Sequence, residues 1–302
     1  FTLNRLFADE CEAVSGRGGQ ALRGVINAQI TGFVQVLGQA ETSKISDKLD
    51  ADTWNAVDVT EDHQAQVDKL IGAMDKDPPE WASSTAPIWE SPAPANHQTN
   101  GDAGSNGTTA TSSPEKPSTP VPTSKSQTKP AIIDQNRFIL VSSATALPPI
   151  ITTCLSLTSS LPSLTPQIAT SLLEVLRAFN SRSSQLILGA GATRIAGLKN
   201  ITTKHLALSS QALAFVIALT PYIRECVRRH LPQNQTAILA DFDKTKRLYQ
   251  EHQSGIHDKL VEIMTARSAA HVKAMLALNF DAASASPSPY METLTKETLT
   301  LH

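Results

Sequence analysis

The segment from Phe179 to Leu213 constrains the fold more than any other part of this 302-residue chain. It reads FNSRSSQLILGAGATRIAGLKNITTKHLALSSQAL, in which an apolar run with glycines leads through a short basic connection into a second apolar stretch. The spacing predicts a long amphipathic helix that enters this segment from upstream. Its apolar and small residues recur at the steps of three and four that mark one helix face: Ile168, Leu172, Val175, Leu176, Phe179, Ser183, Leu186 and Ala190.

The glycines at 189 and 191 first suggest a phosphate-binding loop after a strand. A dinucleotide fingerprint needs a third glycine at position 194, where this chain has Arg194. A P-loop needs Gly-Lys-Ser/Thr after its spacer, which is also absent. We therefore interpret the small residues from 189 to 192 as a place where another helix approaches closely, or as the end of the helix.

Two stretches of sequence, FNSRSSQLILGAGA and GLKNITTKHLALSSQAL, resemble the C-terminal region of the Vps fifty-four-type subunit of GARP, the Golgi-associated retrograde protein complex. The resemblance extends through RRHLP and ILADFDKTKRLYQEHQSGIHDKLVEIM, so it covers residues 165–280 strongly and residues 1–80 weakly. The sequence lacks an initiator Met, so we expect a fragment of a longer protein, and the resemblance implies a fungal-type member of the family. The signature residues, expected to serve packing or partner contact, are Phe179, Asn180, Arg182, Gly189, Gly191, Gly197, Lys199, Thr202 and Thr203.

This resemblance implies a non-enzymatic subunit of a vesicle-tethering complex in retrograde transport from endosomes to the trans-Golgi network. The C-terminal region would serve attachment to the carrier. The implied partners are the other GARP subunits, endosome-derived vesicles and SNARE-type proteins, with no nucleic acid and no cofactor. The implied location is peripheral, on the cytosolic face of the trans-Golgi network and endosomes. The alternative is a generic helical scaffold or adaptor without a role in membrane traffic.

Composition favours an all-α fold, because aromatic residues make up only 5% of the chain and aliphatic residues supply most of its 40% apolar content. We expect an elongated helical-bundle rod of the multisubunit tethering complex type. Residues 1–80 would form a helical rod segment and residues 132–302 a C-terminal bundle truncated at its end. Residues 81–131 are rich in Pro, Ser and Thr and have too few apolar side chains to offset the entropy of ordering, which predicts a disordered insert.

The rod segment contains three stretches with helical spacing. The first ends at Ser15, and its stripe contains Leu3, Phe7 and Val14. The third contains Val67 and Met74 and is ended by two prolines. The second is predicted to run from Gln20 to Leu49, with these residues facing inward: Leu22, Ile26, Phe33, Leu37 and Ile45.

No charged residue occurs between Arg137 and Glu174, which raises the question of a membrane span. The uncharged run is long enough, since about 20 residues suffice. However, Ser and Thr are frequent, Pro148-Pro149 interrupts the run, and interfacial anchors are missing from its flanks. We expect residues 139–157 to be buried in the protein, as two short helices or one helix kinked at the prolines, and we predict no transmembrane segment.

Two further long helices are expected after the signature segment. One begins at Thr202 and ends near His230, because Pro232 follows. The next begins around Asn234 and carries apolar residues every seven positions, which predicts a packing seam. The residues of this bundle seam are Phe242, Tyr249, Ile256, Leu260 and Ile263.

The sequence contains no recognisable catalytic or metal-binding constellation. His252 and His257 are five apart, about 140° round a helix, so they cannot chelate a metal as an i, i+4 pair would. We expect His252 to face solvent. The three widely spaced cysteines predict reduced thiols without a disulfide or metal framework. Residues 131–302 carry 16 basic and 11 acidic side chains, an excess that fits either a solvated face or peripheral association with an anionic membrane.

Overall fold

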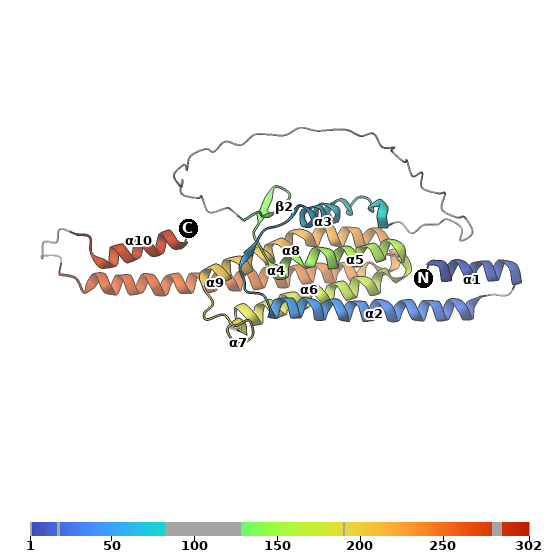
Figure 1. Ribbon diagram of the computed structural model, residues 1–302, viewed down its shortest axis with the longest axis horizontal. Helices are drawn as coiled ribbons and strands as arrows, with labels where there is room; N and C mark the ends of the chain where they lie inside the picture. Colours follow the sequence, from blue (N-terminus) through green and yellow to red (C-terminus); the bar gives the residue numbers. More distant parts are fainter. Residues whose placement is uncertain (1, 17–18, 82–127, 190, 280–285, 302) are drawn as a thin grey trace, which may run out of the picture. The chain divides into compact units, whose positions relative to one another are not determined.

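Figure 1 shows the computed structural model, which describes residues 2–16, 19–81, 128–189, 191–279 and 286–301. Most of these residues are helical, so the all-α prediction is confirmed. In chain order the helices are α1 (Thr2–Ser15), α2 (Gln20–Asp50), α3 (Glu61–Gly72), α4 (Ser142–Thr145), α5 (Leu147–Ser160), α6 (Thr165–Ile187), α7 (Gly191–Arg194), α8 (Thr203–His230), α9 (Leu239–Leu276) and α10 (Pro289–Leu301). Short 3₁₀ turns are η1 (Pro79–Trp81), η2 (Pro162–Leu164) and η3 (Gln233–Ile238).

The described residues divide into two compact units, one that contains residues 2–16 and 19–23 and one that contains residues 24–81, 128–189, 191–279 and 286–301. Residues 24–80 therefore belong with the C-terminal bundle, whereas the sequence suggested a separate rod segment. Most of the predicted insert, residues 82–127, lies outside the described residues. Its two predicted ends are structured, since Trp81 and Ala131 are both buried.

In the first unit, α1 ends at Ser15, as its sequence predicts. Arg23 forms an ion pair with Asp9, at 2.9 Å, and another with Glu12. The predicted apolar stripe of α1 is largely exposed in the described part of the chain, at Leu3, Phe7 and Val14.

In the second unit, α2 buries one face, whose residues are Ile26, Ile30, Val34, Gly38, Glu41, Ile45 and Leu49. Of the predicted inward residues, Ile26 and Ile45 lie on that face. Leu22 and Phe33 are exposed instead, and Leu37 is half-buried. The predicted inward residues therefore lie partly on the neighbouring, exposed face of α2. A Cβ atom at Gly38 would lie 2.7 Å from Cβ of Ser171, so this glycine is where α2 and α6 approach each other closely.

Helix α8 occupies the centre of the bundle and contacts α9 extensively, together with α6, α5 and α3. Figure 1 shows these helices side by side. Capping defines the start of α8, because the Thr202 hydroxyl accepts a hydrogen bond from the backbone N–H of His205. The helix ends before Pro232, as predicted.

Short strands are the feature that the sequence analysis missed. They form two antiparallel pairs: β1 (Ala56–Val57) with β4 (Leu140–Val141), and β2 (Ala131–Ile133) with β3 (Asn136–Phe138). The hairpin between β2 and β3 turns through Asp134 and Gln135, which both have positive φ, as a tight hairpin turn requires. Strands of two or three residues are too short for alternation of apolar residues to reveal them.

The uncharged segment after Arg137 forms β4, α4 and α5, and most of it is buried, as predicted. Pro148 and Pro149 lie in the first turn of α5, where their missing N–H groups cost no hydrogen bond, so they start a helix and kink none. Helix α6 begins at Thr165, after its N-cap residue Leu164. By length and apolar composition α8 could cross a membrane, as could α5 and α6 if their sharp bend were a broken span. Buried core helices meet the same criteria, and more than half of the apolar window of α8 is buried in the protein.

Candidate functional site at the α6–α9 interface

The first signature residues lie where α6 packs against α9. Phe179 is fully buried, and its ring stacks on Tyr249 with centroids 6.5 Å apart and planes 7° from parallel. The Tyr249 hydroxyl donates a 2.6 Å hydrogen bond to the backbone carbonyl of Leu176. Burial raises the pKa of Tyr249 well above its usual value, so this hydroxyl remains a donor. These contacts hold α6 and α9 together.

Asn180 extends this interface through a polar contact with His252. The Nδ1 atom of His252 lies 2.9 Å from the side-chain oxygen of Asn180, so the imidazole donates this hydrogen bond. His252 is only 8% exposed, which corrects the expectation that it faces solvent. Burial lowers the pKa of His252 to about 4, so the ring is neutral at physiological pH. Its Nε2 atom is buried without a hydrogen-bond partner.

Arg182 connects α6 to the end of α2. Its guanidinium donates two hydrogen bonds of 2.6 Å to the two carboxylate oxygens of Asp50. Both side chains are about two-thirds buried, and the paired geometry is the strongest that Arg and a carboxylate can adopt. A single turn of α6 therefore places Phe179, Asn180 and Arg182 as internal connections of the bundle.

The signature glycines mark the end of α6, which is the second of the two interpretations offered above. A Cβ atom at Gly189 would lie 2.6 Å from the carbonyl oxygen of Gln185, and one at Gly191 would lie 2.8 Å from the same atom. The chain thus folds back on the last turn of α6, and among the described residues the three atoms nearest to each added Cβ all belong to Gln185 or Leu186. Gly197 has φ of +68°, a conformation that favours glycine.

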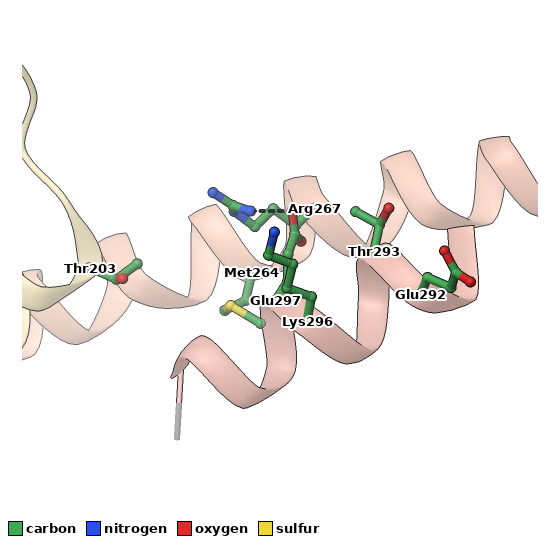
Figure 2. Close-up of a pocket in the computed structure, with 7 residues that line it drawn as sticks. All are labelled: Thr203, Met264, Arg267, Glu292, Thr293, Lys296 and Glu297. Atoms are coloured by element: carbon green, nitrogen blue, oxygen red, sulfur yellow. Dashed lines mark ion pairs between the residues drawn. The ribbon is translucent and has the colours of Figure 1, made fainter. Parts of the chain in front are cut away.

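The remaining signature residues lie at the start of α8. Thr202 forms a reciprocal capping box, because its backbone N–H also donates to Nδ1 of His205. Lys199 is exposed. Thr203 lines a cavity of 560 Å³, and Figure 2 shows its walls on α9 and α10. The other lining residues are Met264, Arg267, Glu292, Thr293, Lys296 and Glu297.

Two of the charged groups that line this cavity, Arg267 and Glu297, pair with each other. Glu297 pairs with Arg267 at 2.5 Å and with His271 at 3.0 Å, which joins α10 to α9. The lining contains no nucleophile paired with a base, so its arrangement offers a docking space and no evident covalent chemistry.

The predicted seam of α9 is only partly enclosed. Phe242, Tyr249 and Ile256 are fully buried. Leu260 and Ile263 are half-buried, so the expectation that neighbouring helices surround Leu260 is wrong. The enclosed part of the seam ends at Ile256.

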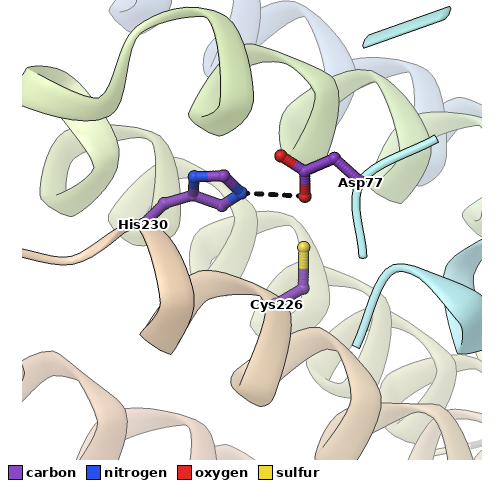
Figure 3. Close-up of side chains that lie close together, drawn as sticks. All are labelled: Asp77, Cys226 and His230. Carbon is purple, nitrogen blue, oxygen red and sulfur yellow. Dashed lines mark hydrogen bonds and ion pairs between the residues drawn. The ribbon is translucent and has the colours of Figure 1, made fainter. Parts of the chain in front are cut away.

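A second cluster, which the sequence analysis missed, lies at the other end of α8. Figure 3 shows Asp77, Cys226 and His230 pointing toward one another, and their donor atoms lie within 4.8 Å of each other. Burial would raise the pKa of Asp77, but hydrogen bonds from His230 and Ser159 and the neighbouring positive charge of Arg229 bring it below its usual value. Cys226 and His230 are four residues apart on a helix, which was the one available signal. Asp77 could not be paired with them before the fold was known.

Comparisons with known proteins agree with the earlier resemblance. The family model described as Vps54-like protein matches residues 135–267, which run from the β2–β3 turn into the distal part of α9. Vacuolar protein sorting-associated protein 54 of Homo sapiens is 32% identical over 269 residues, covering 87% of this chain and 23% of the relative. The Mus musculus protein of that name is 29% identical over 303 residues, covering 99% of this chain and 26% of the relative.

A plant relative extends the range of species. Vacuolar protein sorting-associated protein 54, chloroplastic, of Arabidopsis thaliana is 28% identical over 306 residues, covering 90% of this chain and 30% of the relative. The chain thus spans less than a third of the length of these curated relatives. No solved structure gives a significant match. The homology extends over nearly the whole chain and the family model covers residues 135–267, so the chain belongs to the Vps54-like protein family.

Proposed function

We propose that this chain is part of a non-enzymatic subunit of a vesicle-tethering complex, GARP, that acts in retrograde transport from endosomes to the trans-Golgi network. The observation that carries the proposal is the Vps54-like match over residues 135–267, together with relatives named as vacuolar protein sorting proteins. The residues described here would serve carrier attachment, and other regions of the whole protein would hold it in the complex. The proposed location is peripheral, on the cytosolic face of the trans-Golgi network and endosomes.

The architecture supports a binding role over a catalytic one. Conspicuous polar contacts of the signature segment, such as Arg182 with Asp50 and Asn180 with His252, join helices inside the bundle. They hold a rigid body that can present an outer surface to partners. The partners proposed are the other subunits of the complex, endosome-derived vesicles and SNARE-type proteins.

A flotation assay tests this proposal. The purified chain is mixed with endosome-derived carriers and floated on a density gradient, with carriers derived from the endoplasmic reticulum as the matched control. We expect the chain to float with endosome-derived carriers and to stay at the bottom with the control carriers. A chain that remains soluble in both mixtures would favour the generic helical scaffold.

A destabilised variant controls for unfolding in that assay. Phe242→Ala opens the enclosed seam without altering a surface side chain, so any loss of flotation must scale with its unfolded fraction. Flotation that persists when the protein is fully unfolded would show adsorption of exposed apolar residues to membranes, and would contradict a specific tether.

A further inference from the structure

The cluster at the C-terminal end of α8 has the arrangement of a three-ligand metal site. Cys226 and His230 are separated by four residues, so both project from the same side of the helix. Asp77 comes from the segment between α3 and η1 and completes the group from across the interface. The Nε2 atom of His230 lies 3.0 Å from a carboxylate oxygen of Asp77, and all three donor atoms fall within 4.8 Å of one another.

The donor set suits zinc. Thiolate, imidazole and carboxylate are its usual protein ligands, and sites with three protein ligands leave the fourth position to water. Ligand distances of about 2.0–2.3 Å place tetrahedral donors about 3.5 Å apart, so small side-chain adjustments would let these donors share one ion. Within the described residues this is the one group of three such ligands found so close together.

Surrounding hydrogen bonds orient the carboxylate. Arg229 donates from Nη1 to Asp77 at 3.0 Å and to the backbone carbonyl of Ala73 at 2.7 Å. Ser159 of α5 also hydrogen-bonds to Asp77. Outer contacts of this kind hold ligands in known metal sites and tune their affinity.

We infer that Asp77, Cys226 and His230 form a zinc site that joins the α3–η1 segment to the end of α8. On binding, the Cys226 thiol gives up its proton to solvent, and the imidazole proton of His230 moves from Nε2 to Nδ1 by exchange with solvent. The thiolate sulfur, the imidazole Nε2 and a carboxylate oxygen of Asp77 then donate electron pairs to the ion, and no oxidation occurs. Without a metal, burial raises the pKa of the Cys226 thiol to about 12, so the thiol keeps its proton. The competing interpretation is therefore an ion pair of Asp77 with Arg229 and His230, with the protonated thiol buried beside it.

Cobalt titration of the full chain, after removal of metals with a chelator, separates these interpretations. We expect one equivalent of Co²⁺ to give a sulfur-to-metal charge-transfer band that zinc then abolishes. Cys226→Ser should remove the band, and Asp77→Asn should weaken Co²⁺ binding at least tenfold. Cys11→Ser, which changes a cysteine of the other compact unit, should leave the charge-transfer band and the Co²⁺ affinity unchanged.

A folding control keeps the inference testable. Circular dichroism should show that each variant remains helical, and if Cys226→Ser unfolds, folded His230→Gln replaces it. Absence of a thiolate band in the unmodified chain would overturn the inference. So would a band that survives in Cys226→Ser, or unchanged Co²⁺ affinity in folded His230→Gln.

Discussion

The two halves of α9 carry similar seven-residue patterns but lie in different surroundings. From Leu239 to Ile256 the helix packs between α6 and α8, and Phe242, Tyr249 and His252 are all buried. From His257 to Leu276 no described side chain is fully buried. The period of a sequence therefore predicts which side of a helix is apolar, and the lengths of neighbouring helices decide how far that side is covered.

Part of the reason for the change lies in the start of α8, which still accompanies α9 just past Ile256, since the Ser210 hydroxyl lies 3.0 Å from Nε2 of His257. Thr203, the first residue of α8, lines the same cavity as Met264 and Arg267 of α9. Beyond this point α8 no longer accompanies α9, and α10 contacts it instead through Glu297. The distal half of α9 thus keeps a mixed surface, with Val272 and Leu276 exposed by 51% and 76%.

Truncation of one side chain in each half of α9 should give the largest difference in stability. Phe242 is 0% exposed, so Phe242→Ala should lower the free energy of unfolding by about 3–5 kcal/mol. Val272→Ala, the matched control in the distal half, should change it by less than about 0.5 kcal/mol. Urea denaturation followed by circular dichroism measures both values. Equal losses would mean that the distal half is enclosed as well.

The buried imidazole of the proximal half predicts a dependence of stability on pH. Because burial lowers the pKa of His252 to about 4, the unfolded chain takes up a proton near pH 6.5 while the folded chain does not. The contribution of His252 is therefore complete above about pH 6.5 and is lost as the pH falls toward 4, by about 1–3 kcal/mol.

Unfolding measurements between pH 7 and pH 4 check this sign. His252→Gln should flatten the dependence in that window. A profile that is as steep in His252→Gln as in the unmodified chain would assign the effect to other groups.

A substitution at Gly189 tests the close contact between the turn after α6 and the Gln185 carbonyl oxygen. In Gly189→Ala the new methyl group would meet the Gln185 carbonyl oxygen at 2.6 Å, so the turn must shift, at a cost of about 1–2 kcal/mol. Gly32→Ala, in the interior of α2 where no atom lies within 4 Å, should instead stabilise the chain by about 0.5–1 kcal/mol. Thermal melts of the two variants should shift in opposite directions, and a shared direction would show that the turn is looser than described.

Removal of one hydroxyl should give the smallest effect. Tyr249→Phe keeps the ring stacked on Phe179 but deletes the 2.6 Å hydrogen bond to Leu176, for a loss of about 0.5–1.5 kcal/mol. A urea midpoint that shifts by an amount typical of Phe242→Ala would indicate that the hydroxyl also holds contacts elsewhere.

The sequence was sufficient where a regular period extended over several turns. It predicted α6, α8 and α9 and the buried positions Phe242, Tyr249 and Ile256, because long amphipathic patterns leave few alternatives. It failed where a contact depends on distant residues, as for β1 with β4, Asn180 with His252, and Asp77 with Cys226. His252 seemed a surface residue because a polar side chain on a long helix usually is, and only its Asn180 partner explains its burial.

Hydrogen exchange along α9 tests where its enclosed half ends, since it reports the local opening of each turn in one experiment. We predict that amides of residues 243–256 exchange roughly a hundredfold or more slowly than those of residues 262–276, because the proximal turns open only when α6 and α8 release them. Uniform protection along the whole helix would contradict the account, because it would mean that the seam stays enclosed beyond Ile256.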